Sequence, residues 1–209
     1  MNDPIFKGLY VITDERLQFK ELIQRTKLIL DAGIPVLQYR DKTTDQALRR
    51  NRALQLKELC GDYQTVFLIN DDVRLARDIG AEGVHIGQED MSVVEARQIL
   101  GDKVIIGVSC YNRLEDAKTA AQFGVDYVAF GAFFSTQTKN KTVKAETKLL
   151  QQAKTELSVP VVAIGGINPD NGRELVQAGA DMLAVISCVY ENTDPREIVF
   201  QFKKLYQEQ

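Results

Sequence analysis

Short apolar segments recur along this chain and alternate with segments of helical periodicity. The β-branched and apolar composition of these segments predicts eight strands, at residues 9–13, 36–40, 66–70, 83–87, 105–109, 127–133, 161–165 and 182–187. Between the strands the apolar residues are spaced three and four apart, as at Leu22, Thr26 and Ile29. That spacing is typical of crossover helices that cover a sheet with one face.

Helix boundaries are predicted from capping residues and glycines. Ser92 with Glu95 and Asn112 with Glu115 have the pattern of capping boxes, and Asn168 and Asp194 each precede a proline in a first turn. Glycines that end a helix before the next strand are expected at Gly33, Gly61, Gly80, Gly101, Gly124 and Gly179. The repeating unit is therefore helix, glycine, strand.

The length of the chain suits one closed barrel. Eight units in 209 residues give about 26 residues each, near the lower end of what a (β/α)8 TIM barrel requires. We expect a single α/β domain over residues 1–209. The alternative is an open, doubly wound sheet, but the first strand is not followed by a G-x-G-x-x-G motif.

Composition limits the partners of the chain. A formal net charge of -3 and a pI near 5.4 indicate no overall attraction to nucleic acid or to an anionic membrane. The first residues lack the pattern of a signal peptide, and the three cysteines are far apart without C-x-x-C spacing. We expect a cytoplasmic protein that acts on small molecules, and a homo-oligomer remains open.

The end of the second strand is cationic. In a barrel of this kind the site lies at the carboxyl ends of the strands, and alternation sends Gln38, Arg40 and Lys42 to one side. These side chains suit an anion, although a solvated rim would have the same composition.

Two acidic residues follow the third and fourth strands. Asp71 and Asp90 are expected on neighbouring strand ends, where two carboxylates repel each other unless a cation joins them. Mg²⁺ prefers such ligands together with phosphate oxygens. The alternative is that Asp71 or Asp72 caps the next helix.

Polar loops follow the last three strands. Residues 135–139 carry three hydroxyls and Lys139, Gly165 and Gly166 end the seventh strand, and Ser187 ends the eighth. Glycine and hydroxyl groups here suit a phosphate, although Gly165 and Gly166 are also typical of a tight turn. His85 is expected as a packed ring inside a strand, and Cys110 and Cys188 as small apolar side chains, so none of these is assigned to catalysis.

Taken in order, the motifs of the chain resemble the thiamine phosphate synthase family. They are GLYVITD at residues 8–14, QYRDK at 38–42, IND at 69–71, GVHIGQEDM at 83–91, IGVS at 106–109, TQTK at 136–139 and AIGGI at 163–167. The resemblance covers nearly the whole chain, and Tyr39 departs from the aliphatic residue expected between the glutamine and the arginine.

The resemblance implies a transferase of thiamine biosynthesis, EC 2.5.1.3. That family joins 4-amino-2-methyl-5-hydroxymethylpyrimidine diphosphate to a thiazole phosphate, with or without an additional carboxylate, and releases diphosphate. It implies Mg²⁺ as cofactor, held by Asp71 and Asp90. We hypothesise that Mg²⁺, Arg40, Lys42 and Lys139 stabilise charge on the departing diphosphate, so that a pyrimidine-methyl cation forms. The expected catalytic residues are Lys139, Arg40 and Ser109. Pyrimidine diphosphate contacts would come from Gln38, Tyr39, Arg40, Asp41, Lys42, Asn70, Ser109 and Lys139. Thiazole phosphate contacts would come from Thr136, Gln137, Thr138, Gly166, Ile186 and Ser187.

Two other functions remain open on the same barrel. A related branch moves a proton to aromatise the thiazole, but it needs a base where this chain has Ser109. A ligand-binding regulator without catalysis is the third possibility, because fold alone does not fix function. Asp71, Asp90 and Lys139 would have no task in either of these proteins.

Overall fold

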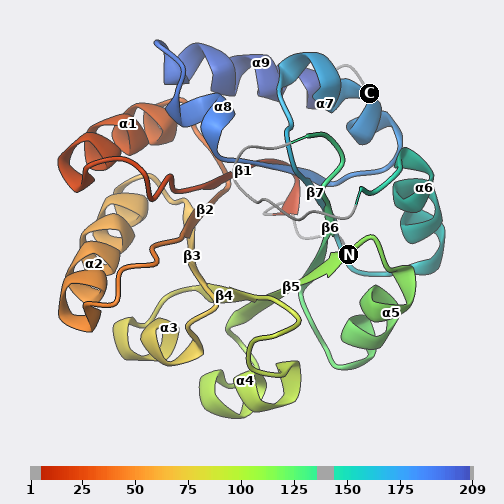
Figure 1. Ribbon diagram of the computed structural model, residues 1–209, viewed down its shortest axis with the longest axis horizontal. Helices are drawn as coiled ribbons and strands as arrows, with labels where there is room; N and C mark the ends of the chain where they lie inside the picture. Colours follow the sequence, from red (N-terminus) through yellow and green to blue (C-terminus); the bar gives the residue numbers. More distant parts are fainter. Residues whose placement is uncertain (1–5, 136–143, 208–209) are drawn as a thin grey trace.

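The eight expected strands are present, and they pair in chain order to close one barrel (Figure 1). The computed structural model describes residues 6–135 and 144–207. All pairs are parallel, including the closing pair of the first and last strands, where Leu9 lies opposite Leu183. The strands are β1 Gly8–Ile12, β2 Val36–Tyr39, β3 Val66–Asn70, β4 Gly83–Ile86, β5 Ile105–Tyr111, β6 Tyr127–Gly131, β7 Val161–Ile164 and β8 Met182–Val185. The (β/α)8 TIM barrel is confirmed, and the open doubly wound sheet is excluded.

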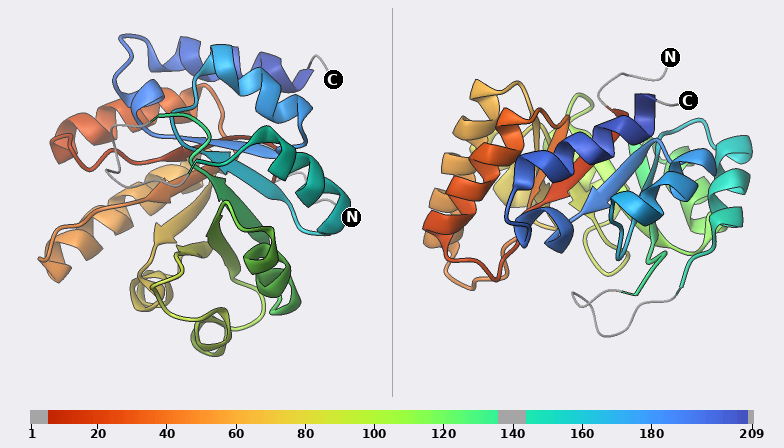
Figure 2. Two further views of the ribbon diagram at one scale, coloured as in Figure 1. Left: turned by 45° about the vertical axis from the view of Figure 1, so that its right-hand side comes forward. Right: turned by 90° about the horizontal axis from the view of Figure 1, so that it is seen from above.

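Helices surround the sheet and cover its outer face (Figures 1 and 2). Helix α9 packs between α7 and α1, next to the closing pair of strands. The helices are α1 Phe19–Asp31, α2 Gln46–Asp62, α3 Val73–Ile79, α4 Val93–Leu100, α5 Leu114–Gln122, α6 Thr147–Glu156, α7 Pro169–Gln177, the short α8 Ser187–Tyr190 and α9 Pro195–Gln207. Within the described residues, no helix is both long enough and apolar enough to cross a membrane.

Strand alternation divides the core into two layers. Outward-facing residues such as Leu37, Phe67 and Val84 pack against the helices. A smaller inner cluster fills the barrel and includes Tyr10 and Tyr127. The polar ends of the inward-facing rows are therefore left for a site.

Most of the expected helix starts are confirmed. Ser92 forms a capping box with Glu95, and Asn168 caps α7 before its proline. The prediction for Asn112 was wrong, because α5 begins after Arg113 without a side-chain cap. The Asn112 amide instead donates across to the carbonyl of Lys144, at 3.5 Å. A contact distant in sequence has replaced the local cap.

Glycine ends the helices as expected at every predicted position except one. Gly33, Gly80, Gly101, Gly124 and Gly179 all have positive φ, which glycine adopts without strain. Gly61 was wrongly predicted to end its helix: α2 continues to Asp62. The positive φ of 56° is found at Gln64.

Candidate active site

A cavity of about 450 Å³ lies at the carboxyl ends of the strands. Residues at or near the carboxyl end of every strand line it, so the barrel gathers its strand ends around one space. Predicted site residues in the lining are Gln38, Arg40, Asn70, Ser109, Gly166, Ile186 and Ser187. Residues that the sequence analysis did not assign to the site include His85, Tyr111, Asn168 and Glu191.

Arg40 is held at the pocket by the first strand and its loop. The backbone N-H of Arg40 donates to Thr13 Oγ1 at 2.8 Å, and the Thr13 hydroxyl donates back to the Arg40 carbonyl at 3.1 Å. The Arg40 guanidinium pairs with Glu15 at 2.7 Å, and its side chain is only 10% exposed. The cation is therefore fixed at the rim by contacts from β1 and its loop.

Tyr39 and Asp41 face the helices, as alternation predicts for the residues between Gln38, Arg40 and Lys42. The Tyr39 hydroxyl donates to Asp41 at 2.7 Å, and Arg52 of α2 donates to the same carboxylate at 2.9 Å. Burial opposes ionisation of Asp41, but hydrogen bonds from the Thr43 N-H, Tyr39 and Arg52 lower its pKa overall. Neither Tyr39 nor Asp41 lines the cavity, so their predicted substrate contacts stay predictions.

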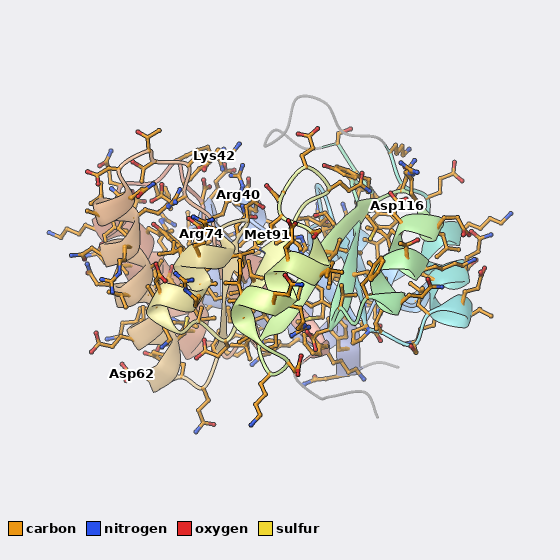
Figure 3. All side chains as sticks on the ribbon, turned by 90° about the horizontal axis from the view of Figure 1, so that it is seen from below. Arg40, Lys42, Asp62, Arg74, Met91 and Asp116 are labelled. Atoms are coloured by element: carbon orange, nitrogen blue, oxygen red, sulfur yellow. The ribbon has the colours of Figure 1, made fainter. Side chains whose placement is uncertain are left out.

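Lys42 lies at the same end of the barrel as Arg40, whereas Asp62, the last residue of α2, lies at the other end (Figure 3). Lys42 is exposed and is not part of the cavity lining. A flexible lysine at this position can reach an anion at the rim as a mobile point charge.

The predicted metal ligands follow adjacent strands. The Asp71 N-H donates to the His85 carbonyl at 2.8 Å, which ties the end of β3 to β4. Asp71 has a φ of 62° and accepts from the Asn70 amide at 2.5 Å, while Asp90 accepts from the Gly87 N-H at 2.8 Å. Both aspartates are exposed. No group of three or more His, Cys, Asp or Glu side chains placed to hold a metal occurs in residues 6–135 and 144–207.

Asp72 is a helix cap. Its side chain accepts from the Leu75 N-H at 2.8 Å, at the start of α3, and from Arg49 at 2.5 Å. The capping alternative is therefore confirmed for Asp72, which is turned toward α2 and α3.

The loops after β6 and β7 are packed closely together. The Phe133 and Phe134 N-H groups donate to the carbonyls of Ile164 and Gly165. Gly166 has a φ of 61°, and a Cβ there would clash with the carbonyl oxygen of Ser135. Glycine is thus required both by conformation and by space. Thr136, Gln137, Thr138 and Lys139 lie outside the described residues.

Ser187 has a cationic neighbour that sequence reasoning missed. Arg16 donates to the Ser187 hydroxyl at 3.1 Å and pairs with Asp14 at 2.5 Å and Glu191 at 2.7 Å. Asp14 and Arg16 lie in the loop after β1, whereas Ser187 begins α8 and Glu191 follows that helix. The two segments meet because β1 and β8 are the closing pair of the barrel. The contact joins positions 171 residues apart, so no local pattern could have predicted it.

His85 is satisfied by hydrogen bonds, as expected, but it also lines the cavity. Its Nδ1 lies 2.9 Å from the Tyr127 hydroxyl and its Nε2 lies 2.9 Å from Ser109 Oγ. The strand position of His85 could have placed it in the site, because His85 lies opposite Asn70 in register and both face inward.

The cysteines fit their expected role as apolar side chains. Burial raises the pKa of the Cys110 thiol to about 12 and that of Cys188 to about 11. Both are therefore protonated at neutral pH and poor nucleophiles.

Known proteins resemble this chain along almost its whole length. The family model for thiamine monophosphate synthase matches residues 9–189. The thiamine-phosphate synthase of Nitrosospira multiformis is 45% identical over 202 residues, which are 97% of this chain and 86% of that protein. That of Nitrosococcus oceani is 44% identical over 199 residues, with 95% and 92% covered.

Solved structures agree with the sequence matches. The thiamine phosphate pyrophosphorylase of Pyrococcus furiosus superposes with a TM-score of 0.87 at 34% identity, covering 98% of both chains. The orotidine 5'-phosphate decarboxylase of Pyrococcus horikoshii has a TM-score of 0.68 at 15% identity and shares the fold alone, with 95% of this chain and 98% of that one covered. The family match over most of the barrel shows that this chain belongs to the thiamine monophosphate synthase family.

Proposed function

We propose that this chain joins 4-amino-2-methyl-5-hydroxymethylpyrimidine diphosphate to thiazole phosphate, yielding thiamine phosphate and diphosphate. With the 2-carboxy form of the thiazole, CO2 is released as well. The observation that carries the proposal is one cavity with Arg40 on one side and the Gly166 and Ser187 loops on the other. Such a space can receive two phosphorylated molecules with their rings between the anionic groups.

The diphosphate half is assigned to the ends of β2 and β3. Arg40 is permanently charged, and its guanidinium can donate to two phosphate oxygens at once. Lys42 and Lys139 add mobile charges, and Asn70 lines the same side of the cavity. These groups stabilise negative charge that grows on diphosphate as it departs.

Asp71 and Asp90 are the proposed ligands of Mg²⁺. They fit the ion because both are exposed carboxylates in the loops that follow adjacent strands, and Mg²⁺ is usually held by one or two carboxylates plus phosphate oxygens and water. When bound, the ion would supply positive charge next to the leaving diphosphate.

The thiazole half is assigned to the loops after β6, β7 and β8. The Gly166 backbone has no side chain to block a phosphate, and the Ser187 hydroxyl is a donor at the same rim. Thr136 to Thr138 and Ile186 complete the proposed contacts. Arg16 donates to the Ser187 hydroxyl and positions it, while the charge of Arg16 is already paired with Asp14 and Glu191.

With thiazole phosphate as the substrate, the proposed reaction needs no proton transfer. The bond between the pyrimidine methylene carbon and the diphosphate oxygen breaks, and its electron pair leaves with diphosphate. The resulting cation is delocalised over the aminopyrimidine ring, and the thiazole nitrogen lone pair then forms the new bond to the methylene carbon. Gln38, Ser109 and the two phosphate sites hold the rings in line, so the protein contributes placement and electrostatics.

A turnover assay tests this function. Purified protein with both substrates and Mg²⁺ should release diphosphate, and omission of the metal or of either substrate should abolish the release. Binding without turnover would favour a regulator, and conversion of a thiazole substrate alone would favour the proton-transfer branch. Lys139→Ala should slow the single-turnover rate far more than it weakens thiazole binding, and an unchanged rate would remove this residue from the mechanism.

A further inference from the structure

A continuous chain of hydrogen bonds crosses the barrel beneath the pocket. Gln38 Nε2 lies 2.6 Å from the Tyr10 hydroxyl, which lies 2.9 Å from the Tyr127 hydroxyl. The Tyr127 hydroxyl lies 2.9 Å from His85 Nδ1, and His85 Nε2 lies 2.9 Å from Ser109 Oγ. The chain thus joins two pocket-lining side chains, Gln38 and Ser109, through residues on β1, β6 and β4.

Packing fixes the aromatic rings that belong to this hydrogen-bond chain. Tyr10 and Tyr127 are 2% and 0% exposed, and the rings of Tyr127 and His85 stack at 5.6 Å. A Cβ at Gly107 would overlap the Tyr127 ring, so the glycine of β5 makes the room that the phenol occupies. The hydroxyl positions are therefore set by the barrel, independently of any ligand.

The number of available hydrogen atoms determines which group donates in each bond of this hydrogen-bond chain. Burial raises the pKa of both tyrosines, so each phenol keeps one hydrogen and donates once. Because the Gln38 amide donates to Tyr10, Tyr10 must donate to Tyr127, and Tyr127 must donate to His85 Nδ1. If Tyr127 donated to Tyr10 instead, the Tyr10 hydrogen would have no acceptor within the chain.

This direction of donation determines the tautomer of His85 and the role of the Ser109 hydroxyl. A neutral His85 that accepts at Nδ1 carries its hydrogen on Nε2 and donates to Ser109 Oγ. Ser109 then has its own hydrogen available for a ligand, while Gln38 has its carbonyl oxygen available. Reversal of the whole chain would exchange these properties, giving an acceptor at Ser109 and a donor at Gln38.

We propose that Tyr10, Tyr127 and His85 are positioning residues that couple Gln38 to Ser109, so that the pocket presents an acceptor at Gln38 and a donor at Ser109. The ligand recognised in this way is a planar heterocycle with a donor on one edge and an acceptor on another. Its assignment to the aminopyrimidine rests on the proposed function, but the direction of the chain does not.

The protein has a single histidine, so the direction of donation in the hydrogen-bond chain can be measured at one imidazole ring. Protein without a histidine tag, labelled with ¹⁵N-histidine, should give the imidazole signals of the neutral tautomer with hydrogen on Nε2. Tyr127→Phe should shift the Nδ1 signal, because that nitrogen loses its donor. Tyr10→Phe should also change the tautomer populations, although Tyr10 is two hydrogen bonds away from the ring.

Tyr190→Phe is the matched control. It removes another buried hydroxyl, which lies 2.8 Å from Thr26 Oγ1 outside this chain, and it should leave the His85 signals unchanged. A wild-type signal with hydrogen on Nδ1 or on both nitrogens would overturn the proposed direction. Unchanged signals in Tyr10→Phe would overturn the coupling and leave the tyrosines as packing residues.

Kinetics test the functional part separately. Tyr10→Phe and Tyr127→Phe should raise KM for the pyrimidine diphosphate about tenfold, while KM for thiazole phosphate changes less than about twofold. Equal changes in both constants would contradict a role at the pyrimidine. If no variant and no wild-type protein turned over, the proposed function would fail, and the NMR result would still decide the direction of the chain.

Discussion

The guanidinium of Arg40 lies 2.7 Å from the Glu15 carboxylate, at the rim of the cavity. Glu15 belongs to the loop after β1, and its side chain is 27% exposed, whereas that of Arg40 is 10% exposed. Before substrate binds, the Glu15 carboxylate is therefore paired with Arg40, the residue that we propose binds the diphosphate. An incoming diphosphate has to compete with it and also experiences its negative charge.

Replacement of Glu15 should consequently tighten substrate binding. We expect Glu15→Gln to lower KM for the pyrimidine diphosphate about two- to fivefold, the effect of removing one partly buried ion pair near the surface, with little change in kcat. Steady-state kinetics at low ionic strength would measure this effect. A higher KM would mean that Glu15 orients Arg40 for the substrate, in contrast to the competition proposed here.

Removal of either proposed metal ligand should change the magnesium requirement. We expect Asp71→Asn and Asp90→Asn to raise the Mg²⁺ concentration for half-maximal activity about tenfold or more, because each loses a charged oxygen ligand. Asp72→Asn is the control, since it keeps a side chain able to cap α3 and loses only the charge paired with Arg49. Equal magnesium titrations for all three variants would remove Asp71 and Asp90 as ligands.

The fold was predictable because its signals are local and repeat eight times. Alternation within strands and caps at helix starts gave the element order, and only boundary details were wrong. Asn112 donates to the Lys144 carbonyl and does not cap α5, and α2 continues past Gly61. In both cases a contact or a conformation elsewhere replaced the local preference.

The site was predictable where strand parity determines direction. Parity correctly placed Gln38 and Arg40 at the cavity and turned Tyr39 away from it, whereas Lys42, sent to the same side, does not line the cavity. Ser109, which the family resemblance implied, also lines the cavity. Arg16 and Glu191 were missed because their loops meet only when β1 and β8 close the barrel. A pattern within one segment contains no information about that meeting.

The space above Gly166 should control the thiazole phosphate half. An alanine there would be strained by the φ of 61°, and its Cβ would press on the Ser135 carbonyl oxygen. We expect Gly166→Ala to raise KM for thiazole phosphate about tenfold, by displacing the loop after β6. Gly124→Ala is the control, because Gly124 has a φ of 76° and a Cβ added there would meet no atom within 4 Å.

Gly124→Ala should therefore reveal the effect of backbone strain alone. We expect its Tm to fall by a few degrees, about 2–4 °C per kcal/mol for a chain of this size, with both KM values unchanged. If the two variants raised KM for thiazole phosphate equally, strain and not the contact with Ser135 would be responsible.

Asp41 should make the stability of the barrel depend on pH in the acid range. Its hydrogen bonds from Thr43, Tyr39 and Arg52 outweigh burial and lower its pKa in the folded protein. A lowered folded pKa stabilises the protein above the unfolded value of about 3.9, and this contribution is lost as pH falls through the folded pKa. Urea unfolding of the wild type should therefore show a smaller free energy of unfolding at pH 3 than at pH 6.

In Asp41→Asn the decrease in the free energy of unfolding between pH 6 and pH 3 should be smaller by about 1 kcal/mol. Asp102→Asn, at an exposed position, is the control and should retain the wild-type decrease. An Asp41→Asn variant with the full decrease would show that other carboxylates cause the acid sensitivity.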